Sequence, residues 1–170
     1  YVDERTIVPR SFIAELLDEQ LAPWVEDPWA VGKVLDLCTG SGCLAILAAL
    51  AFPHARVDAV DLSPGAISVA ERNVANYGLD ERIDLVRSDA FANLQGRRYD
   101  LILTNPPYVD AADMATLPDE YRHEPALALA SGEQGLDAII HILAHAPAHL
   151  NPGGALVAEV GNSHAALAAR

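Results

Sequence analysis

The chain has 170 residues, of which 51% are hydrophobic and 21% are charged, a balance typical of one globular domain with a substantial core. The formal net charge of −13 disfavours direct nucleic-acid binding, because a field of that sign repels polyanions. The chain has no apolar stretch long enough to span a bilayer, no signal-peptide pattern and too few cysteines for a disulfide framework, so a cytoplasmic location is predicted.

Residues 1–30 are predicted to form a leader segment with a helix over residues 11–21. The first strand candidate is the apolar run KVLDLC at 33–38. The turn TGSG follows it, and then a helical run at 43–52 that Pro53 ends.

The second strand is predicted at 55–62, and Ser63 before a proline indicates a helix start. This helix is expected to reach residue 77 and to stop at Gly78, a residue suited to a left-handed cap. Further strands are predicted at 82–89, 99–104 and 155–160, with a helix over 135–150 and a turn at 151–154.

The alternation of apolar strands and helices predicts an α/β fold with a doubly wound, mostly parallel sheet. Ligands bind at the carboxyl ends of the strands in such sheets. The candidate site residues of this chain all fall at such ends.

A glycine loop with Gly40 and Gly42 follows the first strand, and Asp61 ends the second. Glycines let a ligand approach the backbone, and Asp61 can accept hydrogen bonds from both hydroxyls of a ribose. Dinucleotide dehydrogenases and S-adenosylmethionine (SAM) methyltransferases share this pattern, and a tight turn without a ligand is a further alternative. Asp36 favours SAM because it can meet an ammonium group that NAD lacks. Asp89 can accept a hydrogen bond from an adenine amino group, or it can cap the turn that follows it.

The stretch LTNPPYVD ends the fourth strand with Asn105, Pro106, Pro107 and Tyr108. An amino group on a planar π system is a poor nucleophile, because its lone pair is delocalised. The Asn105 side-chain oxygen and the Pro106 carbonyl can hold its two N–H bonds, the prolines stiffen the loop, and Tyr108 can stack on the planar group. A rigid turn with a buried tyrosine is the structural alternative.

The motifs VLDLCTGSG, VDLS, SDAF and NPPY together resemble those of class I SAM-dependent methyltransferases that modify an amino nitrogen. The continuation NPPYVDAADMATLPDEYRHEPALALASGEQGLD resembles the protein-(glutamine-N5) methyltransferases. The IVPRSFIAELL leader and the YRHEPALALASGE segment resemble those members that act on a glutamine of large-subunit (50S) ribosomal protein number three.

The resemblance implies a Rossmann-like SAM-binding catalytic domain over residues 31–170, with SAM as cofactor and a basic large-subunit ribosomal protein as substrate. It implies no metal, no direct nucleic-acid partner and no membrane partner. The catalytic residues that it implies are Asn105, Pro106, Pro107 and Tyr108, and the cofactor-binding residues are Asp36, Thr39, Gly40, Gly42, Asp61, Leu62, Asp89 and Ala90.

The ends of the chain suggest a truncated piece, because it begins Tyr-Val-Asp and stops inside an alanine-rich helical pattern. We expect the given residues to lack the helical amino-terminal domain and the last antiparallel strands of the family. We therefore expect the fifth strand to lie at the sheet edge, and these residues alone to bind SAM weakly or to be poorly active.

Three positions depart from the family pattern. Cys38 stands where many methyltransferases have glycine, and Phe12 where a second proline is expected. Ala90 stands where some relatives have a larger aromatic residue near adenine, a face that Phe91 is expected to cover. Cys38 and Cys43 are both predicted to be buried.

Two other groups stay ambiguous. His141, His145 and His149 share one face of a helix and could hold zinc, but Pro147 interrupts the stretch and no acidic or cysteine ligand accompanies them, which favours a solvated face. Residues 122–124 form either a lid or a surface loop.

Three functions compete with glutamine methylation. An adenine N6 or guanine N2 methyltransferase acting on DNA or RNA would use the same Asn-Pro-Pro-aromatic chemistry. A nicotinamide-dependent oxidoreductase would explain only the glycine loop. A non-catalytic SAM-binding module would bind the cofactor but would have no use for the residues 105–108.

Overall fold

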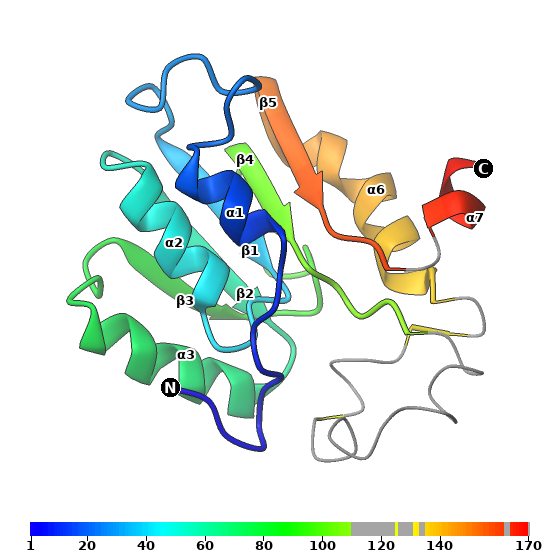
Figure 1. The fold of residues 1–170 in the computed structure, drawn as a ribbon, viewed down its shortest axis with the longest axis horizontal. Coiled ribbons are helices and arrows are strands. Elements are labelled where there is room, and N and C mark those ends of the chain that lie inside the picture. The colour runs from blue at the N-terminus through cyan, green and yellow to red at the C-terminus, as the bar shows by residue number, and fades with distance from the viewer. Residues whose placement is uncertain (110–124, 126–130, 133–134, 162–163, 170) are drawn as a thin grey trace.

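The computed structural model describes residues 1–109, 125, 131–132, 135–161 and 164–169. Five parallel strands form one sheet in the order β3-β2-β1-β4-β5 (Figure 1). Their bounds are β1 Lys33–Leu37, β2 Arg56–Asp61, β3 Ile83–Arg87, β4 Tyr99–Thr104 and β5 Leu150–Ala158. The predicted parallel α/β sheet is therefore confirmed, with β5 at one edge as expected.

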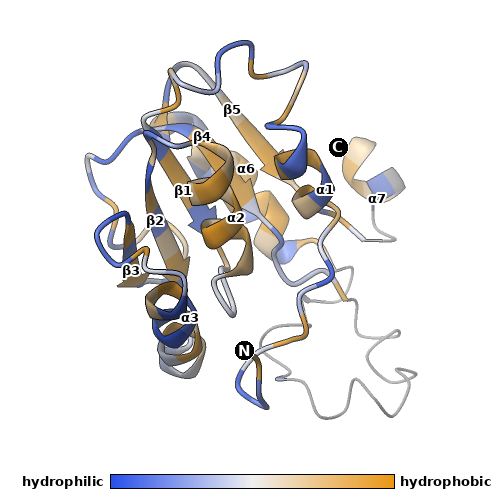
Figure 2. Cartoon of the chain, turned by 60° about the vertical axis from the view of Figure 1, so that its left-hand side comes forward, coloured by the Kyte–Doolittle hydropathy of each residue, from blue (hydrophilic) through white to orange (hydrophobic). Residues whose placement is uncertain are grey.

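Helices cover both faces of the sheet (Figure 1). Two apolar clusters show this arrangement, since one joins α1 and α2 to the sheet and the other joins α6 to it. The strands and α2 are predominantly hydrophobic (Figure 2). The helix bounds are α1 Ile13–Asp18, α2 Cys43–Ala51, α3 Pro64–Asn76, α6 Asp137–His149 and α7 His164–Ala168.

The ends of α3 follow local sequence rules. The Ser63 hydroxyl accepts a hydrogen bond from the Ala66 amide at 3.2 Å, and Pro64 occupies the first turn. Gly78, just past the helix, has φ +64°. The predicted start and stop of this helix are both confirmed.

Two helices differ from the predicted ranges. The helix of the leader is shorter than predicted, because Gln20 and Leu21 adopt φ values of 53° and 59° that a right-handed helix does not contain. In α6, Pro147 does not interrupt the helix. It lies in the last turn, where its missing N–H removes only one helical hydrogen bond.

The segment predicted as a turn at 151–154 belongs to β5, so that prediction was wrong. The pairing with β4 passes from Tyr99 with Leu150 to Leu101 with Ala155, and the extra residues of β5 form an irregularity in the ladder. Pro152 is tolerated because β5 is an edge strand.

The leader is fastened to the domain at both ends. The Arg72 guanidinium lies 3.7 Å from the centroid of the Tyr1 ring, over α3. The Glu159 carboxylate, just after β5, accepts hydrogen bonds from the Ser11 hydroxyl at 2.6 Å and the Phe12 amide at 3.0 Å. Between these points the leader runs past the carboxyl ends of the strands (Figure 1).

The helices that the structure describes are too short or too polar to span a lipid bilayer.

Candidate functional site

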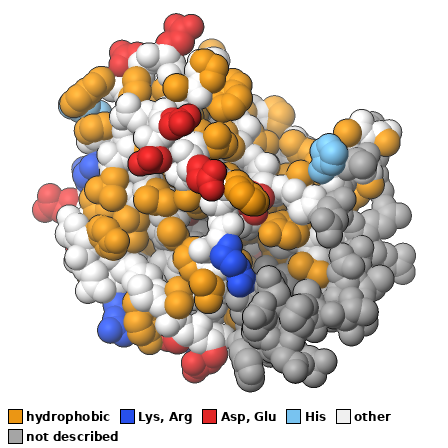
Figure 3. All heavy atoms as spheres, in the orientation of Figure 1, with side chains coloured by type: hydrophobic (Ala, Val, Ile, Leu, Met, Phe, Trp, Pro, Cys, Tyr) orange, Lys and Arg blue, Asp and Glu red, His pale blue; other side chains and the backbone are white. Residues whose placement is uncertain are grey.

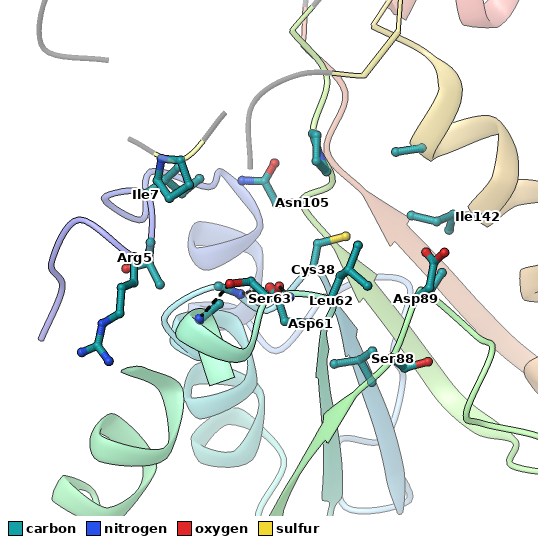
Figure 4. Close-up of a pocket in the computed structure, with 18 of the residues that line it drawn as sticks. Arg5, Ile7, Cys38, Asp61, Leu62, Ser63, Ser88, Asp89, Asn105 and Ile142 are labelled. Atoms are coloured by element: carbon teal, nitrogen blue, oxygen red, sulfur yellow. Dashed lines mark hydrogen bonds between the residues drawn. The ribbon is translucent and has the colours of Figure 1, made fainter. Parts of the chain in front are cut away.

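A cavity of about 350 Å³ opens at the carboxyl ends of the strands (Figure 4). Its size is that of a small-molecule site. The structure brings together, in its lining, seven of the predicted site residues: Gly40, Asp61, Leu62, Asp89, Ala90, Asn105 and Pro107. The other five lie outside the lining: Asp36, Thr39, Gly42, Pro106 and Tyr108.

Asp61 ties the glycine loop to the end of β2. Its Oδ2 accepts a hydrogen bond from the Gly40 amide, and its Oδ1 accepts one from the Ser63 amide, both at 2.9 Å. Burial raises the pKa of Asp61, and these backbone hydrogen bonds oppose the rise. Each carboxylate oxygen has a second acceptor site, so Asp61 can still receive ligand hydroxyls from the cavity.

Asp36 stands behind the loop. It is fully buried, and its Oδ2 accepts a hydrogen bond of 2.6 Å from the Thr39 hydroxyl. Its Oδ1 has no hydrogen-bond partner among the residues that the structure describes, and burial raises the pKa of this carboxyl to about 7. In this position Asp36 supports the loop through Thr39, and no part of it faces the cavity.

Gly42 brings α2 close to α3. Its φ is +81°, and a Cβ at this position would lie 3.2 Å from the Cβ of Ala70. The second glycine of the loop thus allows both the turn and the close helix packing.

Two walls of the cavity consist of non-glycine residues with left-handed backbone. Cys38 has φ 61° and Ala90 has φ 42°, values that cost non-glycine residues on the order of 1–3 kcal/mol each. Cys38 therefore has the backbone that a glycine would adopt without strain. Of the three positions that depart from the family pattern, these two lie in the cavity lining and Phe12 does not.

The expectation that both cysteines are buried was wrong. Cys38 and Cys43 are partly exposed, and the Cys38 side chain lines the cavity. Desolvation and then the neighbouring Asp61, Asp36 and Asp89 carboxylates raise the pKa of Cys38 to about 12. The thiol is therefore neutral, and it acts as a wall of the cavity, not as a nucleophile.

Two hydrogen bonds hold Thr104, the last residue of β4, and so fix the start of the loop that follows. The Thr104 hydroxyl donates to the Leu37 carbonyl at 3.0 Å, and the Thr104 carbonyl accepts from the Glu159 amide at 2.9 Å. Asn105 then lies in the cavity lining (Figure 4). The Tyr108 ring lies against Gly161, where a Cβ would approach its Cδ2 to 2.5 Å.

Sequence reasoning missed two groups of lining residues. The leader contributes Arg5, Thr6 and Ile7, and α6 contributes Ala138, His141 and Ile142. The sequence analysis selected residues at the carboxyl ends of predicted strands. Neither of these groups directly follows a strand, so it was not selected. The proposed lid at residues 122–124 lies outside the described residues.

The three histidines share one face of α6, as their spacing predicts. The rings of His141 and His145 are 4.2 Å apart, and His149 stacks on Phe91 at 4.6 Å. Phe91 is buried and its ring packs on that of His149 of α6, so Ala90 lines the cavity and Phe91 does not. Within the part of the chain that the structure describes, no group of three or more His, Cys, Asp or Glu side chains could hold a metal ion.

Comparison with known proteins gives a consistent set of matches. The family model described as "Methyltransferase small domain" matches residues 13–120. Ribosomal protein uL3 glutamine methyltransferase from Bordetella pertussis is 61% identical over 95% of this chain, and that from Burkholderia pseudomallei is 60% identical over 97%. The chain spans 54% and 56% of the lengths of these two relatives.

The fold has matches among solved structures. A SAM-dependent methyltransferase from Agrobacterium tumefaciens aligns with a TM-score of 0.62 and 26% identity. The alignment covers 95% of this chain and 49% of that one. The five-stranded sheet thus has the class I methyltransferase arrangement.

Proposed function

Since the chain belongs to the methyltransferase small domain family, we propose that it transfers a methyl group from SAM to the side-chain amide nitrogen (N5) of a glutamine in ribosomal protein uL3. One observation carries the chemistry: a single cavity joins Gly40, Asp61 and Asp89 to Asn105. The names of the two uL3 glutamine methyltransferases support the substrate. The chain spans about half of those relatives, so the activity of the whole protein is part of the proposal.

The polar and apolar side chains that line the cavity are of the kinds that SAM would need as partners. Asp61 would accept hydrogen bonds from the ribose hydroxyls, and Asp89 would accept one from the adenine amino group. Leu62 supplies apolar contact beside them. Desolvation of Asp61, which its raised pKa records, strengthens the hydrogen bonds that it accepts. When bound, SAM supplies an electrophilic methyl carbon on a sulfonium.

Asn105 and its neighbours would hold the acceptor amide. The Asn105 side-chain oxygen and the Pro106 carbonyl accept hydrogen bonds from the two N–H groups of the glutamine carboxamide. Pro107 would restrict the loop so that these oxygens keep their directions, and Tyr108, whose ring lies against Gly161 outside the lining, would hold the end of this loop in place. The amide nitrogen would then present its lone pair to the methyl carbon. As the N–C bond forms, the C–S bond would break, S-adenosylhomocysteine would leave, and the nitrogen would lose one proton to water without a dedicated general base.

The charge of the chain suits a basic partner. Acidic side chains gather over the region of α1 on the face shown in Figure 3, and the formal net charge is −13. A basic ribosomal protein would be attracted to such a surface, whereas a nucleic acid would be repelled. A ribosomal-protein substrate would place the reaction in the cytoplasm.

The direct test supplies radiolabelled SAM to the full-length protein with uL3, duplex DNA and large-subunit ribosomal RNA in parallel reactions. We expect label in uL3. Asn105→Ala should lower the rate about 100- to 1000-fold, because it removes one of the oxygens that hold the amide, while binding of S-adenosylhomocysteine stays unchanged. Asn76→Ala, at the exposed end of α3, is the matched control and should keep the full rate.

Other outcomes would replace the proposal. Label found only in nucleic acid would establish the adenine or guanine amino-group methyltransferase instead. Binding of S-adenosylhomocysteine without label in any substrate would indicate a non-catalytic module.

A further inference from the structure

Among the described residues that line the cavity, His141 is the only one with an aromatic ring. Tyr108 and Phe91, the two aromatic residues that the sequence placed near the site, both lie outside the lining. His141 comes from α6, on the other side of the cavity from the glycine loop. Of the residues that the structure describes, only one on α6 therefore offers a π face to a planar ligand group in the cavity.

His141 ends a row of stacked rings that leads away from the cavity. Its ring centroid lies 4.2 Å from that of His145, with an interplanar angle of 31°. The His145 ring lies 6.4 Å from the ring of Phe91, which stacks on His149 at 4.6 Å. Planar rings pack favourably at such separations. One face of His141 is thus occupied by the row, and the row ends where the cavity begins.

Hydrogen bonds hold the rest of the row in place. The His145 Nδ1 donates to the His141 carbonyl at 2.8 Å, and the His149 Nδ1 donates to the Arg97 carbonyl at 3.0 Å. Phe91 is buried. His141 therefore rests on a preorganised support, which lowers the cost of ordering its ring against a ligand.

The wall beside His141 suits an aminopurine. The Asp89 carboxylate points toward Ile142, the next residue of α6, and can accept a hydrogen bond from an exocyclic amino group (Figure 4). Ala90 presents only a methyl group, so the cavity keeps room for a flat ring at this point. Adenine has an amino edge and two flat apolar faces. The carboxylate can bind the amino edge, and the aliphatic side chains and the imidazole can contact the faces.

We infer that His141 is a further cofactor-binding residue, whose imidazole stacks on the adenine ring of SAM and extends the row of Phe91, His149 and His145 into the cavity. This inference rests on the proposed function, since it requires an adenosine-containing cofactor. It assigns to α6 the aromatic contact that Ala90 cannot make.

Calorimetric titration of the full-length protein with S-adenosylhomocysteine tests the inference. Loss of one base-stacking contact weakens binding about 5- to 100-fold, so His141→Ala should raise the Kd by that factor. His141→Phe keeps an aromatic face and should bind within about threefold of wild type. Leu143→Ala, an exposed position of the same helix outside the lining, is the matched control and should leave the Kd unchanged.

A second measurement does not depend on a variant. On addition of S-adenosylhomocysteine, the His141 ring protons should move upfield in the proton NMR spectrum of the wild-type protein, because a stacked purine shields them. Wild-type affinity in His141→Ala, equal weakening by Phe and Ala, or an unshifted His141 signal in the complex would each overturn the inference. If wild-type protein binds no S-adenosylhomocysteine at all, the proposed function falls and the inference falls with it.

Discussion

At the scale of single residues, the carboxylates of the site have different tasks because they differ in burial. Asp61 and Asp89 face the cavity, whereas Asp36 is fully enclosed behind the loop. The pKa of Asp36 is raised to about 7, mainly by burial. An enclosed carboxyl that half-ionises near neutral pH stabilises the loop at a cost to the stability of the fold.

The pKa of Asp36 predicts how stability depends on pH. The folded state holds this proton to about pH 7, whereas the unfolded chain releases it near the ordinary aspartate pKa of 3.8. The folded protein therefore binds more protons between these pH values, and the free energy of unfolding falls as pH rises through the window, by on the order of 4 kcal/mol at most for this group. Asp36→Asn carries no charge and should lack this fall.

Urea unfolding of both proteins at pH 4, 6 and 8 measures the effect. The stability of Asp36→Asn relative to wild type should rise by about 3–4 kcal/mol between pH 4 and pH 8. All other titrating groups, including Asp61, are common to both proteins, so the difference isolates Asp36. Parallel pH curves for the two proteins would show that Asp36 ionises normally in the folded state.

At the scale of elements, the site depends on how the loop after β4 meets the end of β5. Tyr108 belongs to this loop and Gly161 to the segment just after β5, and the ring lies where a side chain at 161 would begin. The neighbouring ladder ends at the same point, since the Glu159 amide donates to the Thr104 carbonyl at 2.9 Å. The edge strand thus positions the loop that is proposed to hold the acceptor amide.

Gly161→Ala should displace the Tyr108 ring, because the new Cβ would lie 2.5 Å from Cδ2. We expect the rate of label transfer to uL3 to fall about 10- to 100-fold, as misplacement of a positioning group does, with the affinity for S-adenosylhomocysteine unchanged. Gly32→Ala is the matched control, since its Cβ would meet Asp100 at an ordinary 3.6 Å. A full transfer rate in Gly161→Ala would remove Tyr108 from the account of the site.

At the scale of the whole molecule, charge is the dominant property. Acidic residues outnumber basic ones by 24 to 11, and they gather on the face shown in Figure 3. Long-range fields of this kind act mainly on the rate of association with an oppositely charged partner, and added salt screens them.

Salt should therefore weaken methylation of intact uL3. Between about 50 and 500 mM NaCl we expect kcat/KM for uL3 to fall about 3- to 10-fold, because screening removes the steering of a basic substrate. An uncharged glutamine peptide serves as the control, and its methylation should change little. A kcat/KM for uL3 that stays constant or rises with salt would show that the acidic surface has no part in recruiting it.

Local patterns were enough to predict the order of strands and helices, because hydrophobic runs and caps depend on residues close together in the chain. The Ser63 cap and the Gly78 stop are examples, as is the placement of Asp61 and Asn105 at strand ends. The turn predicted at 151–154 failed because pairing with β4 overrode the local preference of proline and glycine.

Only the tertiary structure could show which residues line the cavity. Arg5 of the leader and His141 of α6 lie far apart in sequence, and they meet at one cavity because packing places the leader and the helix there. Burial is likewise a property of the whole fold, so the sequence could mark Asp36 as a site residue but could not show that it is enclosed. Distances between elements, not the residues within any one of them, decide which side chains face a ligand.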